Sequence, residues 1–154
     1  MDEKICADAA RVGDLDVVIA EIQKGVKLTE WTSSMACASG NMELLEYLLD
    51  RIVWNPWMCA MAARYGHMDV LIWCREHKCP WDAETCANAA RGNHLHILKY
   101  ARSMNCPWDS RTHNYARHYH RDSEMFEWIR DNKAPMDKND TGIECTCDDC
   151  SAIS

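Results

Sequence analysis

A four-residue motif occurs twice in this chain, in the same form and a short distance apart. Cys79-Pro80-Trp81-Asp82 is followed by Cys106-Pro107-Trp108-Asp109, an offset of 106 − 79 = 27. A doublet of small residues keeps the same register, at Ala9-Ala10, Ala36-Cys37, Ala62-Ala63, Ala89-Ala90 and, in a weaker form, Ala116-Arg117. A fixed period of roughly 20 to 50 residues indicates units that stack on one another, because one such unit cannot bury its apolar face alone.

Each unit carries the signals of two helices joined by a turn. Turn-forming pairs follow the doublets, at Gly13-Asp14, Gly40-Asn41, Gly66-His67, Asn93-His94 and His120-Arg121. Apolar residues at spacings of three and four then predict a second, amphipathic helix, as in Met42, Leu45, Leu48 and Leu49. Residues that favour a helix N-cap mark the start of the units, at Asp2, Thr29, Asn55, Asp82, Asp109 and Asp137.

These signals together predict an all-α protein, a solenoid of about five stacked helix-turn-helix repeats. The repeats cover about residues 2–28, 29–54, 55–81, 82–108 and 109–136, within a repeat domain at 1–136. We expect residues 137–154 to form a disordered, Cys-rich acidic tail. The sequence has no signal-peptide pattern and no apolar run near the roughly 18 residues of a membrane span, so we expect a cytoplasmic protein.

The doublet and turn resemble those of ankyrin repeats, most closely in Ala62-Ala63-Arg64-Tyr65-Gly66-His67-Met68-Asp69-Val70. An ankyrin unit has about 33 residues, so each unit here lacks about six, which would be the β-hairpin finger. The Cys-Pro-Trp-Asp linker is similar to that of divergent ankyrin-like repeats abundant in large DNA viruses of amoebae. The resemblance implies a viral, non-catalytic protein–protein interaction scaffold in the host cytoplasm, which binds a host or virion protein through its concave face.

The resemblance also implies that partner contacts lie just after the doublets. Arg and Tyr are enriched at binding hot spots, which favours Arg64, Tyr65, Arg91 and Tyr119, with His118 in the same register. The alternative is that these are ordinary solvated residues near a turn.

A second candidate surface is basic and lies in the fifth repeat. Arg111, Arg117 and Arg121 alternate there with His and Tyr, a composition suited to an anionic partner. The alternative is a polar cap at the end of the stack, where Arg117 replaces the second alanine of the doublet. The two interpretations are compatible. A net charge of −7 makes nucleic acid an unfavourable partner.

The ten cysteines have two interpretations. Five fall in apolar helical patterns and are predicted to be reduced core residues: Cys6, Cys37, Cys59, Cys74 and Cys86. The tail carries Cys145, Cys147 and Cys150, which could hold zinc but lack an obvious fourth ligand. The alternative function is therefore a small zinc- or nucleic-acid-binding protein that uses this tail and the basic fifth repeat. The leading interpretation has no metal and no cofactor.

Two further patterns bear on function. Trp54, Trp81 and Trp108 share one register and are expected to pack between repeats, with an exposed peptide-binding ladder as the alternative. The sequence contains no phosphate-binding loop, nucleophile elbow or His-Glu-x-x-His motif, so we expect no enzymatic activity.

Overall fold

The computed structural model describes residues 2–137, and in this range the chain forms helices, turns and linkers but no strand. The α-helices are α1 (Asp2–Val12), α2 (Leu15–Gln23), α3 (Glu30–Ser39), α4 (Met42–Leu48), α5 (Pro56–Tyr65), α6 (Met68–Glu76), α7 (Ala83–Arg91), α8 (Leu95–Ser103), α9 (Ser110–His120) and α10 (Glu124–Asp131), with a 3-10 helix at Leu49–Arg51. The all-α prediction is confirmed for this range. All of the predicted tail except Asp137 lies outside the described residues.

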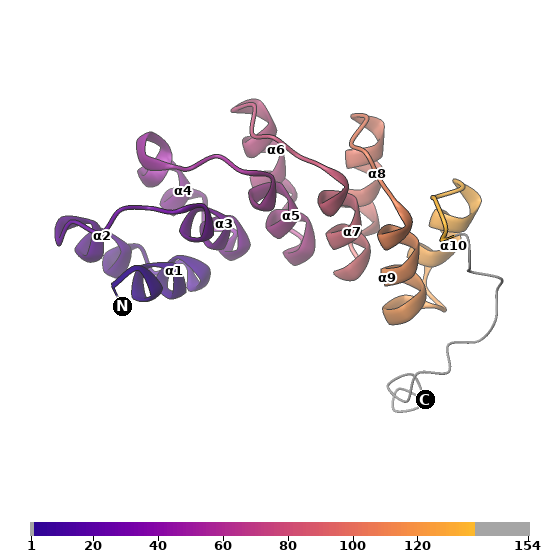
Figure 1. Ribbon diagram of the computed structural model, residues 1–154, viewed down its shortest axis with the longest axis horizontal. Helices are drawn as coiled ribbons and strands as arrows, with labels where there is room; N and C mark the ends of the chain where they lie inside the picture. Colours follow the sequence, from indigo (N-terminus) through magenta and orange to yellow (C-terminus); the bar gives the residue numbers. More distant parts are fainter. Residues whose placement is uncertain (1, 138–154) are drawn as a thin grey trace.

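The helices follow one another as pairs along the long axis of the molecule, from α1 at one end to α10 at the other (Figure 1). The closest packing runs along the odd-numbered helices, since α1 packs on α3, α3 on α5, α5 on α7 and α7 on α9. Most even-numbered helices pack chiefly on the odd-numbered helix before them, and α4 contacts α3 less extensively. We call such a pair a unit, and its members the first and the second helix.

The helix starts follow the predicted caps at four of six positions. The side chains of Thr29, Asn55, Asp82 and Asp109 each accept a hydrogen bond from a backbone N–H two or three residues later. Asp2 differs, because it is the first residue of α1 and not the residue before it. Asp137 ends the described range. The second helices α2, α4 and α10 have caps of the same kind, at Asp14, Asn41 and Ser123.

Left-handed residues form most of the turns within units. Gly13, Gly40, Gly66 and Asn93 have φ values of 76°, 73°, 83° and 60°, at four of the five predicted turns. The fifth turn is different, since Arg121 has φ −54°. The second unit also ends differently from the others. The other second helices are followed by a residue in left-handed geometry, at Gly25, Lys78, Asn105 and Lys133. In the second unit the 3-10 helix takes the place of this residue. This unit is one residue shorter than its neighbours, with 55 − 29 = 26.

The core lies between the first helices and the second helices. The doublets are buried along the first helices, at Ala9, Ala10, Ala36, Cys37, Ala62, Ala63, Ala89, Ala90 and Ala116. Their small side chains allow neighbouring helices to approach closely. Larger side chains of the second helices fill the remaining space, among them Val18, Leu44, Leu45, Leu48, Val70, Leu71, Ile97, Leu98, Met125 and Ile129.

The Trp residues at the predicted packing positions are half-buried against this core. Trp54, Trp81 and Trp108 all contact it. The guanidinium of Arg75 lies 4.1 Å from the centroid of the Trp81 ring. Arg102, at the same register of the next unit, lies 4.4 Å from the Trp108 ring, so the same Arg–Trp contact occurs in consecutive units.

Side chains at the turns connect each unit to the one before it. The Nε2 atom of His67 lies 3.0 Å from the carbonyl oxygen of Ala38, and Nε2 of His120 lies 2.9 Å from that of Arg91. Between the first and the second unit, Asn41 occupies the position that the histidines have in the later units. Its Nδ2 donates to the Gly13 carbonyl at 3.0 Å. These bonds satisfy carbonyl groups at the ends of the first helices, which a helix leaves without an internal partner.

Replacing His67 by Ala tests how much these contacts between units contribute to the stability of the fold. We expect a loss of about 1–2 kcal/mol in the free energy of unfolding, because the Ala38 carbonyl loses its partner. Urea denaturation measures the difference. His96→Ala is the matched control, since His96 is exposed, and it should change the stability little. Equal losses in the two variants would contradict a role of His67 between units.

Candidate functional site

The residues predicted to bind a partner lie at the C-terminal ends of three neighbouring first helices. Arg64 and Tyr65 are the last two residues of α5, and Arg91 is the last residue of α7. His118 and Tyr119 lie in the last turn of α9. Because α5, α7 and α9 pack side by side, these ends form one row.

Contacts between Arg and Tyr side chains order this row. The Arg91 guanidinium lies 5.6 Å from the ring centroid of Tyr115 and 5.7 Å from that of Tyr119. Both rings belong to α9, so this contact joins two units. On α5, the Arg64 guanidinium lies 5.6 Å from the Tyr65 ring. We call Arg64, Tyr65, Arg91, Tyr115 and Tyr119 the Arg–Tyr row.

The row is accessible as well as ordered. Tyr65 is 45% exposed and Tyr119 is 44% exposed, while Arg64 and Arg91 are half-buried. A guanidinium held over a ring has already lost part of its rotational freedom, so it loses less on binding a partner. The ring of His118 lies edge-on to Tyr119, at 4.5 Å between centroids, and extends the aromatic surface.

The three arginines of the predicted anionic-partner patch do not lie together. Arg111 is near the start of α9, where its guanidinium pairs with Glu84 of α7 and with Asp109, at 2.7 Å between Nη2 and Oδ2 for the latter. Arg117 and Arg121 lie toward the other end of the helix. Six residues separate Arg111 from Arg117, which is about 9 Å along the axis at 1.5 Å per residue. Arg111 therefore connects two units through an ion pair.

Arg117 lies in α9, the last first helix among residues 2–137. The pKa of the Asp137 carboxyl is lowered chiefly by its hydrogen bond with Asn114, at 2.8 Å, and to a smaller extent by the nearby charge of Arg117. A charged residue at this position of the doublet suits a unit that no further helix of residues 2–137 covers. This placement supports the polar-cap interpretation for Arg117.

Sequence reasoning did not assign a role to three aromatic residues, of which one is half-buried and two are exposed. Tyr115 belongs to the Arg–Tyr row, and its place four residues before Tyr119, one helical turn away, was a usable signal. Trp31 and Trp57 are 60% and 51% exposed, each at the second position of its helix, α3 and α5. They form a second aromatic surface at the opposite end of the first helices.

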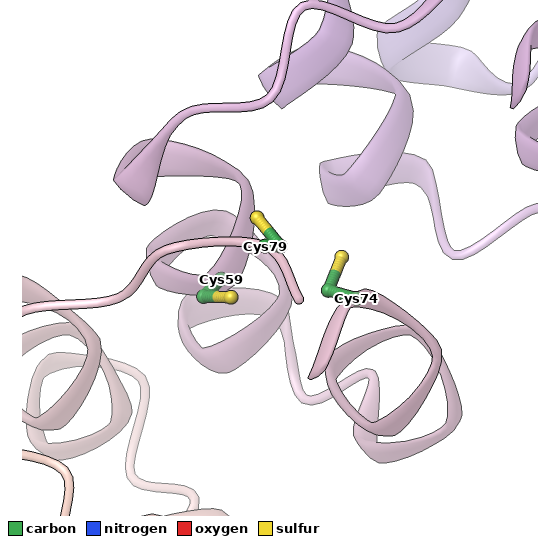
Figure 2. A group of neighbouring side chains, drawn as sticks. All are labelled: Cys59, Cys74 and Cys79. Atoms are coloured by element: carbon green, nitrogen blue, oxygen red, sulfur yellow. The ribbon is translucent and has the colours of Figure 1, made fainter. Parts of the chain in front are cut away.

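The cysteines that could hold a metal within residues 2–137 are not those of the tail. Cys59, Cys74 and Cys79 are buried, and their sulfur atoms all lie within 4.8 Å of one another (Figure 2). Hydrogen bonding from the Cys59 thiol, and then from Cys74, lowers the pKa of Cys79. The predicted ligands Cys145, Cys147 and Cys150 lie outside the described residues.

No protein-family model matches the sequence, and no curated protein matches it significantly. In residues 2–137, no helix combines the length and the apolar character that crossing a membrane requires.

The contact of His94 with Arg64, a residue of the Arg–Tyr row, can be tested through its dependence on pH. The His94 ring is hydrogen-bonded to the backbone of Arg64, and its pKa is lowered chiefly because burial disfavours the charged ring. With the folded pKa below the unfolded value of about 6.5, its contribution to stability is complete above that value and is lost as the pH falls through the folded pKa.

His94→Asn should therefore flatten the fall in stability between pH 7 and pH 5. Asn is a suitable replacement because Asn41 occupies the corresponding position in the first interface and bonds to Gly13 there. Urea midpoints of both proteins at the two pH values measure the effect. The same pH dependence in wild type and variant would show that His94 does not contribute.

Proposed function

We propose that this chain is a non-catalytic, ankyrin-like helical repeat scaffold that binds an acidic segment of another protein through the Arg–Tyr row. The contact of Arg91 with Tyr115 and Tyr119 is the observation that carries the proposal. It holds a cation close to two rings, where neighbouring units meet. The resemblance to viral ankyrin-like repeats supports the scaffold and its role in an infected cell.

The composition of the row fits a protein partner. Arg and Tyr provide large contact areas, directed hydrogen bonds and, for Tyr, few rotatable bonds, which is why they dominate binding hot spots. A carboxylate of the partner would pair with Arg64 or Arg91 and still leave the ring faces open for apolar contacts.

The charge of the row makes an acidic segment the best partner. The whole chain has a net charge of −7, yet two arginines and no carboxylate belong to the row. Long-range repulsion by the whole chain disfavours a polyanion such as nucleic acid. A short acidic peptide segment needs only the local positive potential of Arg64 and Arg91.

Affinity purification with the full chain as bait, followed by titration of each recovered partner, tests the proposal. Arg91→Ala with Tyr119→Ala should weaken a genuine partner by at least about 30-fold, the equivalent of about 2 kcal/mol for a hot spot. Higher salt should also weaken the wild-type complex, because the contact includes an ion pair.

Two control variants make the test specific. Arg130→Ala removes an exposed arginine of α10, outside the row, and should leave the affinity unchanged. Trp31→Ala with Trp57→Ala removes the second aromatic surface and should have little effect. If the tryptophan variant abolished binding while the Arg91 and Tyr119 variant kept every partner, the assignment of the row would be wrong.

A further inference from the structure

Three segments bring a group of thiols together in the middle of the stack. Cys59 lies in α5, Cys74 in α6 and Cys79 in the linker that follows α6. None of the three side chains is exposed to solvent, and their sulfur atoms lie within 4.8 Å of one another (Figure 2). We call them the thiol trio. All three are free cysteines.

The next unit provides an internal comparison. One repeat further along the chain, Cys86 and Cys106 correspond to Cys59 and Cys79, and all four are fully buried. Cys79 Sγ lies 3.4 Å from the carbonyl oxygen of the cap residue Asn55, and Cys106 Sγ lies 3.4 Å from that of the cap residue Asp82. The two thiols therefore occupy the same local setting.

The two units differ at the position of the third cysteine, Cys74. Ala101 stands where the unit before it has Cys74, since 101 − 74 = 27. Both residues are fully buried. Packing alone is thus satisfied by an alanine at this position. The thiol of Cys74 adds a ligand where the core needs only a small residue.

We propose that the thiol trio binds one soft metal ion of low coordination number, for which Cu(I) is the best candidate. A metal–thiolate bond is about 2.3 Å long, so three sulfurs around one ion would be about 4.0 Å apart in a plane. The sulfurs of the trio are already within 4.8 Å of one another, so a small contraction would complete the site.

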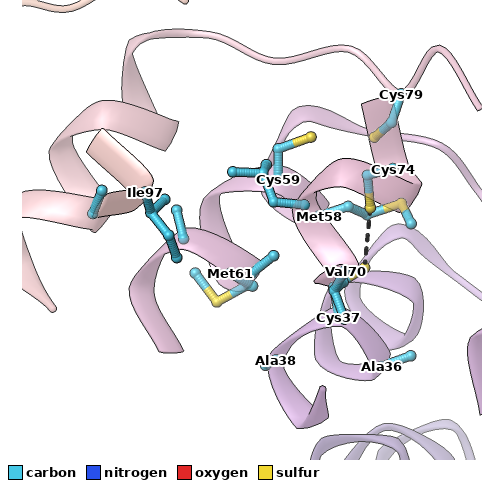
Figure 3. Close-up of a cluster of buried hydrophobic side chains, with 14 of the residues drawn as sticks. Ala36, Cys37, Ala38, Met58, Cys59, Met61, Val70, Cys74, Cys79 and Ile97 are labelled. Atoms are coloured by element: carbon cyan, nitrogen blue, oxygen red, sulfur yellow. Dashed lines mark hydrogen bonds between the residues drawn. The ribbon is translucent and has the colours of Figure 1, made fainter. Parts of the chain in front are cut away.

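The ligand set favours Cu(I) over zinc. Thiolates select soft ions such as Cu(I) and zinc, but structural zinc takes four ligands. Among residues 2–137, this group of converging His, Cys, Asp or Glu ligands has three members. Cys37 of α3 places a further sulfur 3.7 Å from Cys74 Sγ, beside the group and not within it (Figure 3).

Binding is an exchange of protons for the metal. Each thiol that becomes a ligand loses its proton to the solvent, and no electron is transferred. The guanidinium of Arg75, which donates a hydrogen bond to the carbonyl of Cys79, supplies a positive charge beside the thiolates. This charge offsets part of the cost of burying them.

The test titrates the full-length chain with Cu(I) under reducing conditions, supplied as a complex with a chromophoric chelator. The reference protein carries Cys145→Ser, Cys147→Ser and Cys150→Ser, so that the tail does not compete for the ion. We expect one Cu(I) per chain, with X-ray absorption reporting three sulfur neighbours at about 2.3 Å. Stoichiometric zinc with a fourth ligand, and no binding of Cu(I), would overturn the proposal.

Two substitutions in the reference protein locate the site. Cys74→Ala should lower the affinity for Cu(I) by at least about 100-fold, because outer-shell partners alone are worth about 10- to 100-fold. Ala101→Cys should add a second site beside Cys86 and Cys106 and raise the stoichiometry from one to two. Cys86→Ala, the same change outside the trio, should leave the first site unaffected.

Circular dichroism of each variant separates loss of the site from loss of the fold. Binding by folded Cys74→Ala that is as tight as in the reference protein would overturn the proposal. If Cys74→Ala does not fold, Ala101→Cys decides the question. A second Cu(I) supports the geometry of three thiols, and a folded variant with only one contradicts it.

Discussion

The close approach of the first helices is the constraint on which the rest of the structure depends. The three inner ones, α3, α5 and α7, are buried along most of their length, and the doublets keep the side chains between neighbouring first helices small, as at Ala62 and Ala89. A larger residue there would push the helices apart and open the bonds that His67 and His120 make to the unit before. Space is equally limited at the turns. A Cβ atom at Gly40 would lie 2.5 Å from the ring of His67.

The same packing sets the positions of both candidate sites. When the first helices lie side by side, their C-terminal ends meet, and Arg91 reaches two tyrosines of the next unit. In the interior, the helix pair brings Cys59 and Cys74 together, and the linker returns Cys79 to them. A surface suited to a protein partner and a group of thiols suited to a metal ion thus arise from one repeated arrangement.

The sequence was most informative where the chemistry is local. Asn55, Asp82 and Asp109 were predictable as caps, because a cap acts within three residues, and the left-handed turns were predictable from Gly and Asn. Contacts between units depend on how the units stack, which no local signal contains. The approach of Tyr115 to Arg91 and the convergence of the thiol trio are of this kind. One contact between units could have been predicted from the sequence. Glu84 and Arg111 have opposite charges and occupy the same register in consecutive units, and they form an ion pair.

Each unit is stabilised by packing against its neighbours, and this packing positions both candidate sites. Amide hydrogen exchange of the intact chain, followed by mass spectrometry, tests it most directly. We expect the strongest protection in α3, α5 and α7, which have a first helix on both sides. Protection should be weaker in α1 and α9, each of which has a first helix on one side among residues 2–137. Equal protection along all first helices, or the strongest protection in α1 or α9, would contradict it.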